Sequence, residues 1–82
     1  MWHVYIILCE DKSLYTGITN NLERRFRQHV EGKGGEYTRS HKPVKLLYSE
    51  RVRTKTKALK RELQIKSWPR DRKLNFIKIS KR

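Results

Sequence analysis

Residues 2–19 have the sequence WHVYIILCEDKSLYTGIT and predict a β-hairpin. The segment 2–9 is nearly continuous in apolar and aromatic side chains and rich in β-forming residue types, which is typical of a buried strand. Residues 10–13 are polar and predict the turn, and residues 14–19 predict the second strand. Glycine weakens the interior of a strand, so Gly17 indicates a bulge or a close backbone approach.

Beyond this hairpin, apolar residues that recur at every fourth position predict a helix. Asn20 or Asn21 is expected to cap the helix, which should continue to about residue 31. The expected buried stripe consists of Leu22, Phe26 and Val30. The glycine-rich residues 32–35 should end the helix and form a flexible loop.

The rest of the chain predicts a third strand and two more helices. Residues 44–49 predict the strand, and Thr54 or Thr56 is expected to cap a helix that ends at Trp68, just before a proline. Residues 70–80 predict a last short helix. The predicted order is β-β-α-β-α-α, which indicates an α+β fold with a three-stranded antiparallel sheet flanked by helices.

The size of the chain predicts one domain, residues 1–82, with a thin core. Only 35% of its 82 residues are hydrophobic, and a domain of this size buries roughly 60–65% of its unfolded surface. An open surface site is therefore expected in preference to a deep cavity. The single cysteine, Cys9, excludes an intramolecular disulfide and is expected to pack inertly, which fits a reducing cytoplasm.

Charge is the strongest compositional signal. Twenty-one Lys and Arg oppose eight Asp and Glu, and the net charge is +13. Residues 51–82 contain thirteen of these basic residues and two acidic ones, a net charge of +11. Such a field captures polyanions, so nucleic acid is the expected partner, and no membrane partner is expected. A merely solvated basic surface is the alternative interpretation.

Helical geometry sorts the basic residues of the first helix. At about 100° per residue, Arg25 and His29 lie on the same flank of the apolar stripe, so they are able to serve one site. Arg27 lies on the opposite flank, and Arg24 points into solvent. The alternative is an arginine that packs its stem against the core and a histidine that is only hydrogen-bonded.

Glu62 is the anomaly of the second helix. It lies within the expected apolar face, formed by Ala58, Leu59, Leu63 and Ile65. A carboxylate in that position is costly unless hydrogen bonds or a cation compensate for its burial. The compensating group is either Lys66, four residues later, or a divalent metal ion, for which a carboxylate is a natural ligand.

These residues, taken in order with the two tyrosines of the hairpin, resemble the active site of the GIY-YIG nuclease superfamily. The two halves of the name fall on HVY, residues 3–5, and on YTG, residues 15–17, although the first triplet keeps only its tyrosine. Arginine, histidine and glutamate follow in the order of the family, as Arg25, His29 and Glu62.

The resemblance covers nearly the whole chain, and residues 34–50 resemble the small, stand-alone bacterial branch of the superfamily. It implies hydrolysis of phosphodiester bonds in nucleic acid, DNA in preference to RNA, with one divalent cation, Mg²⁺ or Mn²⁺. By resemblance, Glu62 holds the metal and Arg25 steadies the scissile phosphate. Tyr5 and Tyr15 shape the site, and one of them helps to deprotonate the attacking water. Packing within the sheet is the alternative role of both tyrosines.

The remaining implied roles are accessory. By resemblance, His29 handles a proton or contacts phosphate, and Gly17 allows a close backbone approach. The expected nucleic-acid contacts are Arg24, Arg27, Arg39 and Lys66. The alternative function is a non-catalytic nucleic-acid-binding module on a nuclease-like fold. Protein partners are not indicated by the sequence.

Overall fold

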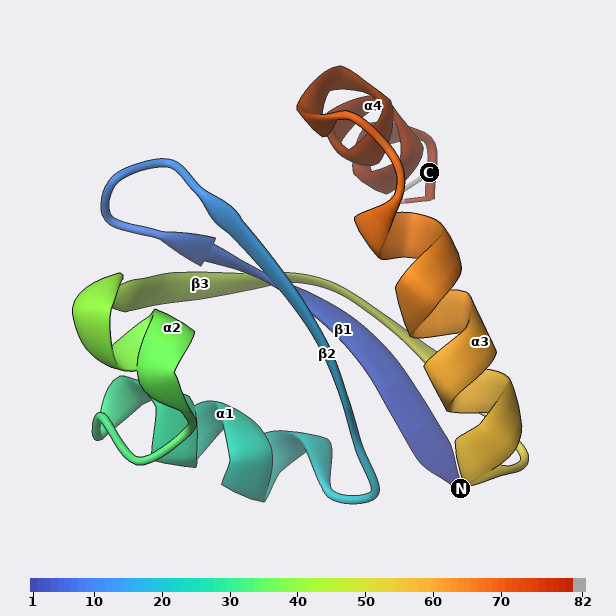
Figure 1. Cartoon of the computed structure of the whole chain (residues 1–82), viewed down its shortest axis with the longest axis horizontal. Helices are drawn as coiled ribbons and strands as arrows, with labels where there is room; N and C mark the ends of the chain where they lie inside the picture. The colour runs from blue at the N-terminus through green and yellow to red at the C-terminus, as the bar shows by residue number, and fades with distance from the viewer. Residues whose placement is uncertain (81–82) are drawn as a thin grey trace.

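The computed structural model of the chain describes residues 1–80 and contains a three-stranded antiparallel sheet with helices on both faces (Figure 1). The strands are β1 (Trp2–Cys9), β2 (Leu14–Thr19) and β3 (Pro43–Val52), in the order β2-β1-β3. The apolar run of the predicted hairpin is therefore the central strand. The predicted α+β class, with its three-stranded sheet, is confirmed.

Two helices cover each face of the sheet. In Figure 1, α1 (Leu22–Val30) and α2 (Glu36–Ser40) lie on one face, and α3 (Lys55–Lys66) and α4 (Arg70–Ser80) lie on the other. The helix α2 was not predicted, so the observed order is β-β-α-α-β-α-α. None of the helices in residues 1–80 has the length and apolar character needed to cross a membrane.

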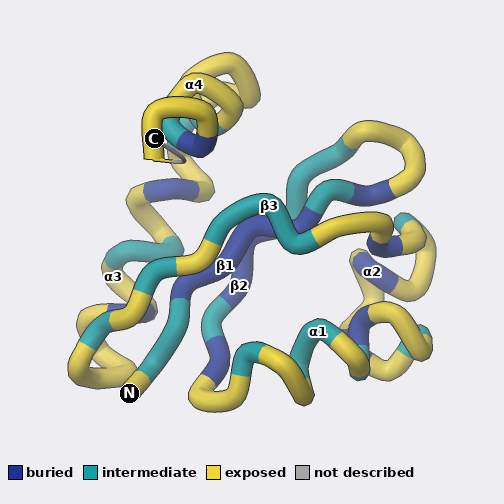
Figure 2. Tube along the Cα trace, turned by 180° about the vertical axis from the view of Figure 1, so that it is seen from behind, coloured by how far each residue is buried: buried dark blue, intermediate teal, exposed yellow. Residues whose placement is uncertain are grey.

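The central strand is apolar along its whole length because both of its faces are covered. Val4 and Ile6 are fully buried in the cluster beneath α3 and α4, whereas Tyr5, Ile7 and Cys9 pack on the side of α1. Figure 2 shows this strand as the most continuously buried part of the chain, with the outer surfaces of the helices exposed. Burial raises the pKa of the Cys9 thiol, as expected of a packed cysteine.

The helix starts follow the capping chemistry of the sequence. The Asn21 side chain accepts a hydrogen bond from the Arg24 amide, and the Thr54 hydroxyl accepts one from the Lys57 amide. Of the two candidate caps predicted for each helix, Asn21 and Thr54 are the residues that cap it. The helix α3 ends at Lys66, two residues before the predicted end at Trp68.

Two predicted apolar faces were partly wrong. Val30 is 49% exposed, and the position that is buried at the end of α1 is His29. On α3, Leu59 and Leu63 are 43% and 68% exposed, so the face toward the sheet is formed by Ala58 and Ile65. Both errors arise because apolar type was used to define the buried face, while the sheet and the loops decide which side of a helix is covered.

Candidate functional site

The hydroxyl of Tyr5 is the centre of the candidate site. Tyr5 is 2% exposed, and it pairs with Gly17 of the neighbouring strand β2. A Cβ atom added to Gly17 would lie 2.5 Å from Tyr5 Oη and 2.7 Å from Tyr5 Cζ. The absence of a side chain at Gly17 therefore lets the phenol lie over β2. The sequence predicted a bulge or a close backbone approach at this glycine, whereas the register is regular and the close neighbours are side-chain atoms of Tyr5 and Tyr15.

His29 holds the Tyr5 hydroxyl from the side of α1. Its Nε2 atom lies 2.8 Å from Tyr5 Oη, and its Nδ1 atom lies 2.7 Å from Thr38 Oγ1 of α2. His29 is fully buried, and Gly34 packs so closely on its ring that a Cβ there would overlap it. Burial, with a smaller contribution from the charge of Arg25, lowers the His29 pKa to about 4. The imidazole is therefore neutral at pH 7, with one N–H donor and one acceptor nitrogen.

The Tyr5 phenol is buried, and nearby charged groups act on its pKa in opposite directions. Burial raises this pKa to about 12, so the phenol is protonated at neutral pH. Arg25 acts in the opposite direction and lowers the pKa, while Tyr15 and Glu62 raise it further. Tyr15 of β2 lies beside the phenol, with 6.3 Å between the ring centroids. The Arg25 guanidinium of α1 and the Glu62 carboxylate of α3 act on the Tyr5 hydroxyl through their opposite charges, and the effect of Glu62 is the smallest of those named.

Arg25 is held in place by the loop after α1. Its Nη2 atom donates to the Gly34 carbonyl over 2.7 Å, and its Nη1 atom donates to Gln28 Oε1 over 3.1 Å. The guanidinium is half-buried. A guanidinium has five N–H donors, so donors remain for an anionic ligand. The predicted pairing of Arg25 with His29 on one flank agrees with their common position beside Tyr5.

Tyr15 extends the site toward α2. Its ring centroid lies 6.3 Å from that of Tyr5 and 5.2 Å from that of His29. On the other side it stacks against Tyr37, with 5.5 Å between ring centroids and an interplanar angle of 25°. Packing and participation in the site, the two alternatives for Tyr15, are thus both compatible with its position.

Glu62 approaches from α3, on the opposite face of the sheet. Arg61 Nε donates to both carboxylate oxygens of Glu50 on β3, each over 3.1 Å, and this contact fixes α3 against the sheet. The next residue, Glu62, has a side chain only 16% exposed. Its Oε2 atom lies 3.4 Å from Lys66 Nζ. The ion pair between Glu62 and Lys66, one of the two alternatives given by the sequence, is therefore present. The Lys66 side chain is 48% exposed.

The donor set fits a weakly held, hydrated divalent cation. Within residues 1–80, no three His, Cys, Asp or Glu side chains gather into a group able to hold a metal. A cation beside Glu62 would have one protein carboxylate. Mg²⁺ tolerates this arrangement because it usually keeps several waters and binds one or two carboxylates together with substrate phosphates. The described residues enclose no pocket.

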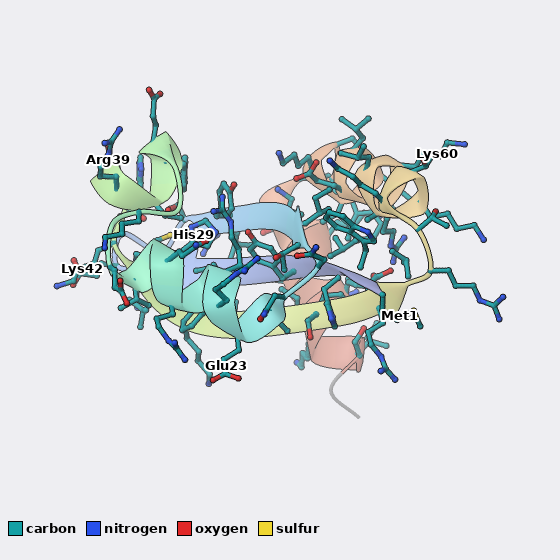
Figure 3. All side chains as sticks on the ribbon, turned by 90° about the horizontal axis from the view of Figure 1, so that it is seen from below. Met1, Glu23, His29, Arg39, Lys42 and Lys60 are labelled. Carbon is teal, nitrogen blue, oxygen red and sulfur yellow. The ribbon has the colours of Figure 1, made fainter. Side chains whose placement is uncertain are left out.

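The expected nucleic-acid contacts are dispersed around this centre. Arg24 is exposed on α1, and Arg39 is exposed on α2 (Figure 3). Arg27 points to another surface and pairs with Glu23 over 3.1 Å. Lys66 is the one member of the set that lies against a predicted site residue.

Two residues of α2 near the site were missed by sequence reasoning. They are Thr38, whose hydroxyl contacts His29, and Tyr37, which stacks on Tyr15. A five-residue helix is too short to show apolar periodicity. The only available signal was an isolated tyrosine after two glycines.

Comparison with known proteins gives consistent matches over nearly the whole chain. Residues 1–75 match the sequence profile of the family described as GIY-YIG catalytic domain. The chain is 47% identical over 75 residues to a UPF0213 protein of Staphylococcus haemolyticus, covering 92% of each chain. It is 51% identical over 77 residues to a UPF0213 protein of Clostridium perfringens, covering 94% of this chain and 83% of that one. The solution NMR structure of a UPF0213 protein from Bacillus halodurans superposes with a TM-score of 0.61 at 35% identity, covering 96% of this chain and 85% of that one.

Proposed function

Because the chain belongs to the GIY-YIG family, we propose that it is a nuclease that hydrolyses phosphodiester bonds of nucleic acid with the help of a divalent cation. The observation that carries the proposal is the buried hydrogen bond between Tyr5 and His29 beside the Tyr15 ring, at a hydroxyl on which the charges of Arg25 and Glu62 both act. A carboxylate, a guanidinium and a phenol supply, respectively, a cation ligand, a phosphate clamp and a proton-handling group. Those are the parts that phosphodiester hydrolysis requires.

In this proposal Glu62 holds the cation, either Mg²⁺ or Mn²⁺. When bound, the cation would act as a Lewis acid and stabilise the charge that develops on the phosphate oxygens. Lys66, which pairs with Glu62 in the structure, would move aside and contact the nucleic-acid backbone. Its half-exposed side chain makes that movement inexpensive, because an ion pair of this exposure contributes about 1 kcal/mol or less.

Tyr5 and His29 would handle the proton of the attacking water. Neutral His29 is able to donate from Nδ1 to the Thr38 hydroxyl and to accept at Nε2 from Tyr5, which fits the observed distances. A proton from water would then pass to Tyr5 Oη as the Tyr5 proton passes to Nε2. The negative charge of a bound phosphate favours the imidazolium and raises the His29 pKa toward the working range. Tyr15 would support the Tyr5 ring from β2.

Arg25 would bind the scissile phosphate through the donors that its loop contacts leave unused. Paired N–H donors suit two oxygens of one phosphate, and they stabilise the additional charge of the transition state. Affinity for the rest of the strand would come from residues 51–82, whose net charge is +11, together with Arg24, Arg27 and Arg39. DNA is the first substrate to test, in single-stranded and double-stranded form.

The test compares cleavage by the wild type with cleavage by two isosteric variants. Labelled DNA is incubated with each protein in Mg²⁺, in Mn²⁺ and in a chelator. Glu62→Gln should lower the cleavage rate at least 100-fold, a magnitude typical of the loss of one group that stabilises transition-state charge. Glu23→Gln removes a carboxylate from the exposed side of α1 and should cleave like the wild type. Equal cleavage by Glu62→Gln and the wild type would refute the proposal, because a contaminating nuclease would then explain the activity.

A second function, a binding module without catalysis, is favoured by one observation. The Lys66 ammonium already supplies a cation to Glu62, so the half-buried carboxylate has a partner without any metal. In that case the protein would bind DNA with an affinity that falls steeply as salt increases. It would show neither metal-dependent cleavage nor a response of Glu62 to Mn²⁺.

A further inference from the structure

A ladder of three aromatic rings leads from the candidate site to the surface of α2. Tyr15 stacks on Tyr37, and Tyr37 stacks on His41 with 4.1 Å between ring centroids and an interplanar angle of 7°. Tyr37 lies between the other two rings, so His41 is the outer ring of the ladder. Tyr37 is 37% exposed, and the His41 side chain is 36% exposed. Aromatic surface therefore remains open to solvent beside the residues proposed to cut nucleic acid.

The outer part of this ladder is held rigidly. His41 Nδ1 donates to the Tyr37 carbonyl over 2.9 Å, and His41 Nε2 lies 3.6 Å from the Asp11 carboxylate at the turn between β1 and β2. The amide of Glu10 in the same turn donates to the Lys42 carbonyl over 2.8 Å. Two segments distant in sequence thus orient the ladder before any ligand arrives. A preorganised surface binds without the cost of ordering its side chains.

We propose that His41, backed by Tyr37, forms a stacking surface for an unpaired nucleobase next to the scissile phosphate, so that the substrate is single-stranded or locally unpaired nucleic acid. The proposal rests on the nuclease function proposed above and names the substrate class of that site. In a duplex, the faces of the bases are covered by neighbouring bases. An aromatic side chain therefore stacks on a base only where the strand is unpaired.

Charge does not explain how a strand would follow α2. The helix carries one acidic and one basic residue, Glu36 and Arg39, which cancel. Most of the strongly basic second half that the structure describes lies in α3 and α4, and Lys60 of α3 lies at the end of the molecule away from Arg39 and Lys42 (Figure 3). Stacking supplies the contact that electrostatics lacks on this side. The strand would run from the basic helices, past Tyr5, to the aromatic ladder.

The test measures binding of two single strands of equal length and equal charge. One is a short oligothymidylate, and the other is a strand of abasic tetrahydrofuran nucleotides. Both are titrated with the full chain in a chelator, and binding is followed by fluorescence anisotropy. For the wild type, the base-bearing strand should bind on the order of tenfold more tightly, the size of one base–aromatic stack.

Variants assign this preference to the ladder. His41→Ala removes the outer ring and should abolish the preference for the base-bearing strand, whereas Tyr37→Phe should keep it because the ring behind His41 remains. Arg39→Ala should weaken both strands by the same factor, because phosphate contacts are independent of the bases. Equal binding of the two strands by the wild type would overturn the inference, and so would a preference that survives in His41→Ala. The comparison within the wild type remains decisive even if His41→Ala fails to fold.

The outcome is separate from that of the proposed activity. Binding is measured without metal and without cleavage, so a missing base preference rejects the stacking surface and leaves the nuclease proposal standing. Conversely, wild-type cleavage rates in Glu62→Gln reject the nuclease proposal whatever the base preference is.

Discussion

Replacing Gly17 with alanine adds one methyl group at a crowded point of the candidate site, against the Tyr5 hydroxyl. The new Cβ atom would lie 2.5 Å from Tyr5 Oη, 2.7 Å from Tyr5 Cζ and 3.1 Å from Tyr15 Cε2, whereas ordinary contacts begin at 3.4 Å. Relief at the hydroxyl alone requires a shift of about 0.9 Å, the difference between 3.4 and 2.5 Å. Tyr5 has little room for this movement, because it is 2% exposed and its hydroxyl contacts His29.

The displacement has two measurable costs. Overpacking of this kind destabilises a protein by about 1–3 kcal/mol, which is followed as the free energy of unfolding in urea. A catalytic group misplaced by about 1 Å lowers a rate on the order of 100-fold, which is followed as the rate of DNA cleavage. Ser49→Ala is the control, because Ser49 pairs with Tyr5 from β3 but is exposed. It should leave both quantities nearly unchanged.

A double-mutant cycle tests the stated cause. Tyr5→Phe removes the closest atom, so Gly17→Ala should destabilise the Tyr5→Phe background less than it destabilises the wild type. A coupling of at least about 0.5 kcal/mol is expected for residues in contact. Additive effects, or wild-type stability and activity in Gly17→Ala, would refute the view that Gly17 exists to make room for Tyr5.

Three further predictions concern the charged groups. The His29 pKa is lowered from 6.5 to about 4 in the folded chain, so the unfolded chain binds an additional proton between these values. The free energy of unfolding in urea should therefore have its full value above about pH 6.5 and fall as the pH approaches 4. For His29→Gln, this free energy should decline less steeply across the same pH window. Lys66→Ala removes the ammonium group that competes with a metal ion for Glu62. It should tighten Mn²⁺ binding about two- to fivefold by calorimetry, since an ion pair of this exposure contributes about 0.3–1 kcal/mol. Weaker Mn²⁺ binding would argue against competition. Arg25→Lys retains the positive charge but not the paired N–H donors. It should lower the cleavage rate on the order of 10- to 100-fold, while DNA affinity measured in a chelator falls much less. Equal losses in both assays would indicate a purely electrostatic role.

The fold was predictable because its main signals are local. The apolar run 2–9 could only be a covered strand, and Asn21 and Thr54 each marked a helix start. The short helix α2 was not predictable, because five residues show no periodicity. It is stabilised by a tertiary contact, the hydrogen bond between Thr38 and His29, that no local pattern encodes.

The candidate site shows the same division between local and tertiary information. Spacing on one helix placed Arg25 beside His29, and the structure agrees. The argument for Glu62 began from the wrong neighbours, since Leu59 and Leu63 are exposed. Glu62 nevertheless lies one helical turn from Ala58 and Ile65, the residues that face the sheet, which explains its partial burial. The hydrogen bond of Tyr5 to His29 joins residues 24 positions apart, and only the assembled fold reveals it.

The central claim is that Glu62 holds a divalent cation beside Tyr5. Its most direct test is a titration of the isotope-labelled chain with Mn²⁺, observed by NMR, in the wild type and in Glu62→Gln. Substoichiometric Mn²⁺ should broaden the signals of Tyr5 and of the middle of α3 first, and this broadening should disappear in Glu62→Gln. Broadening that instead begins at exposed acidic residues such as Glu23 or Asp71, or that is identical in Glu62→Gln, would contradict the claim.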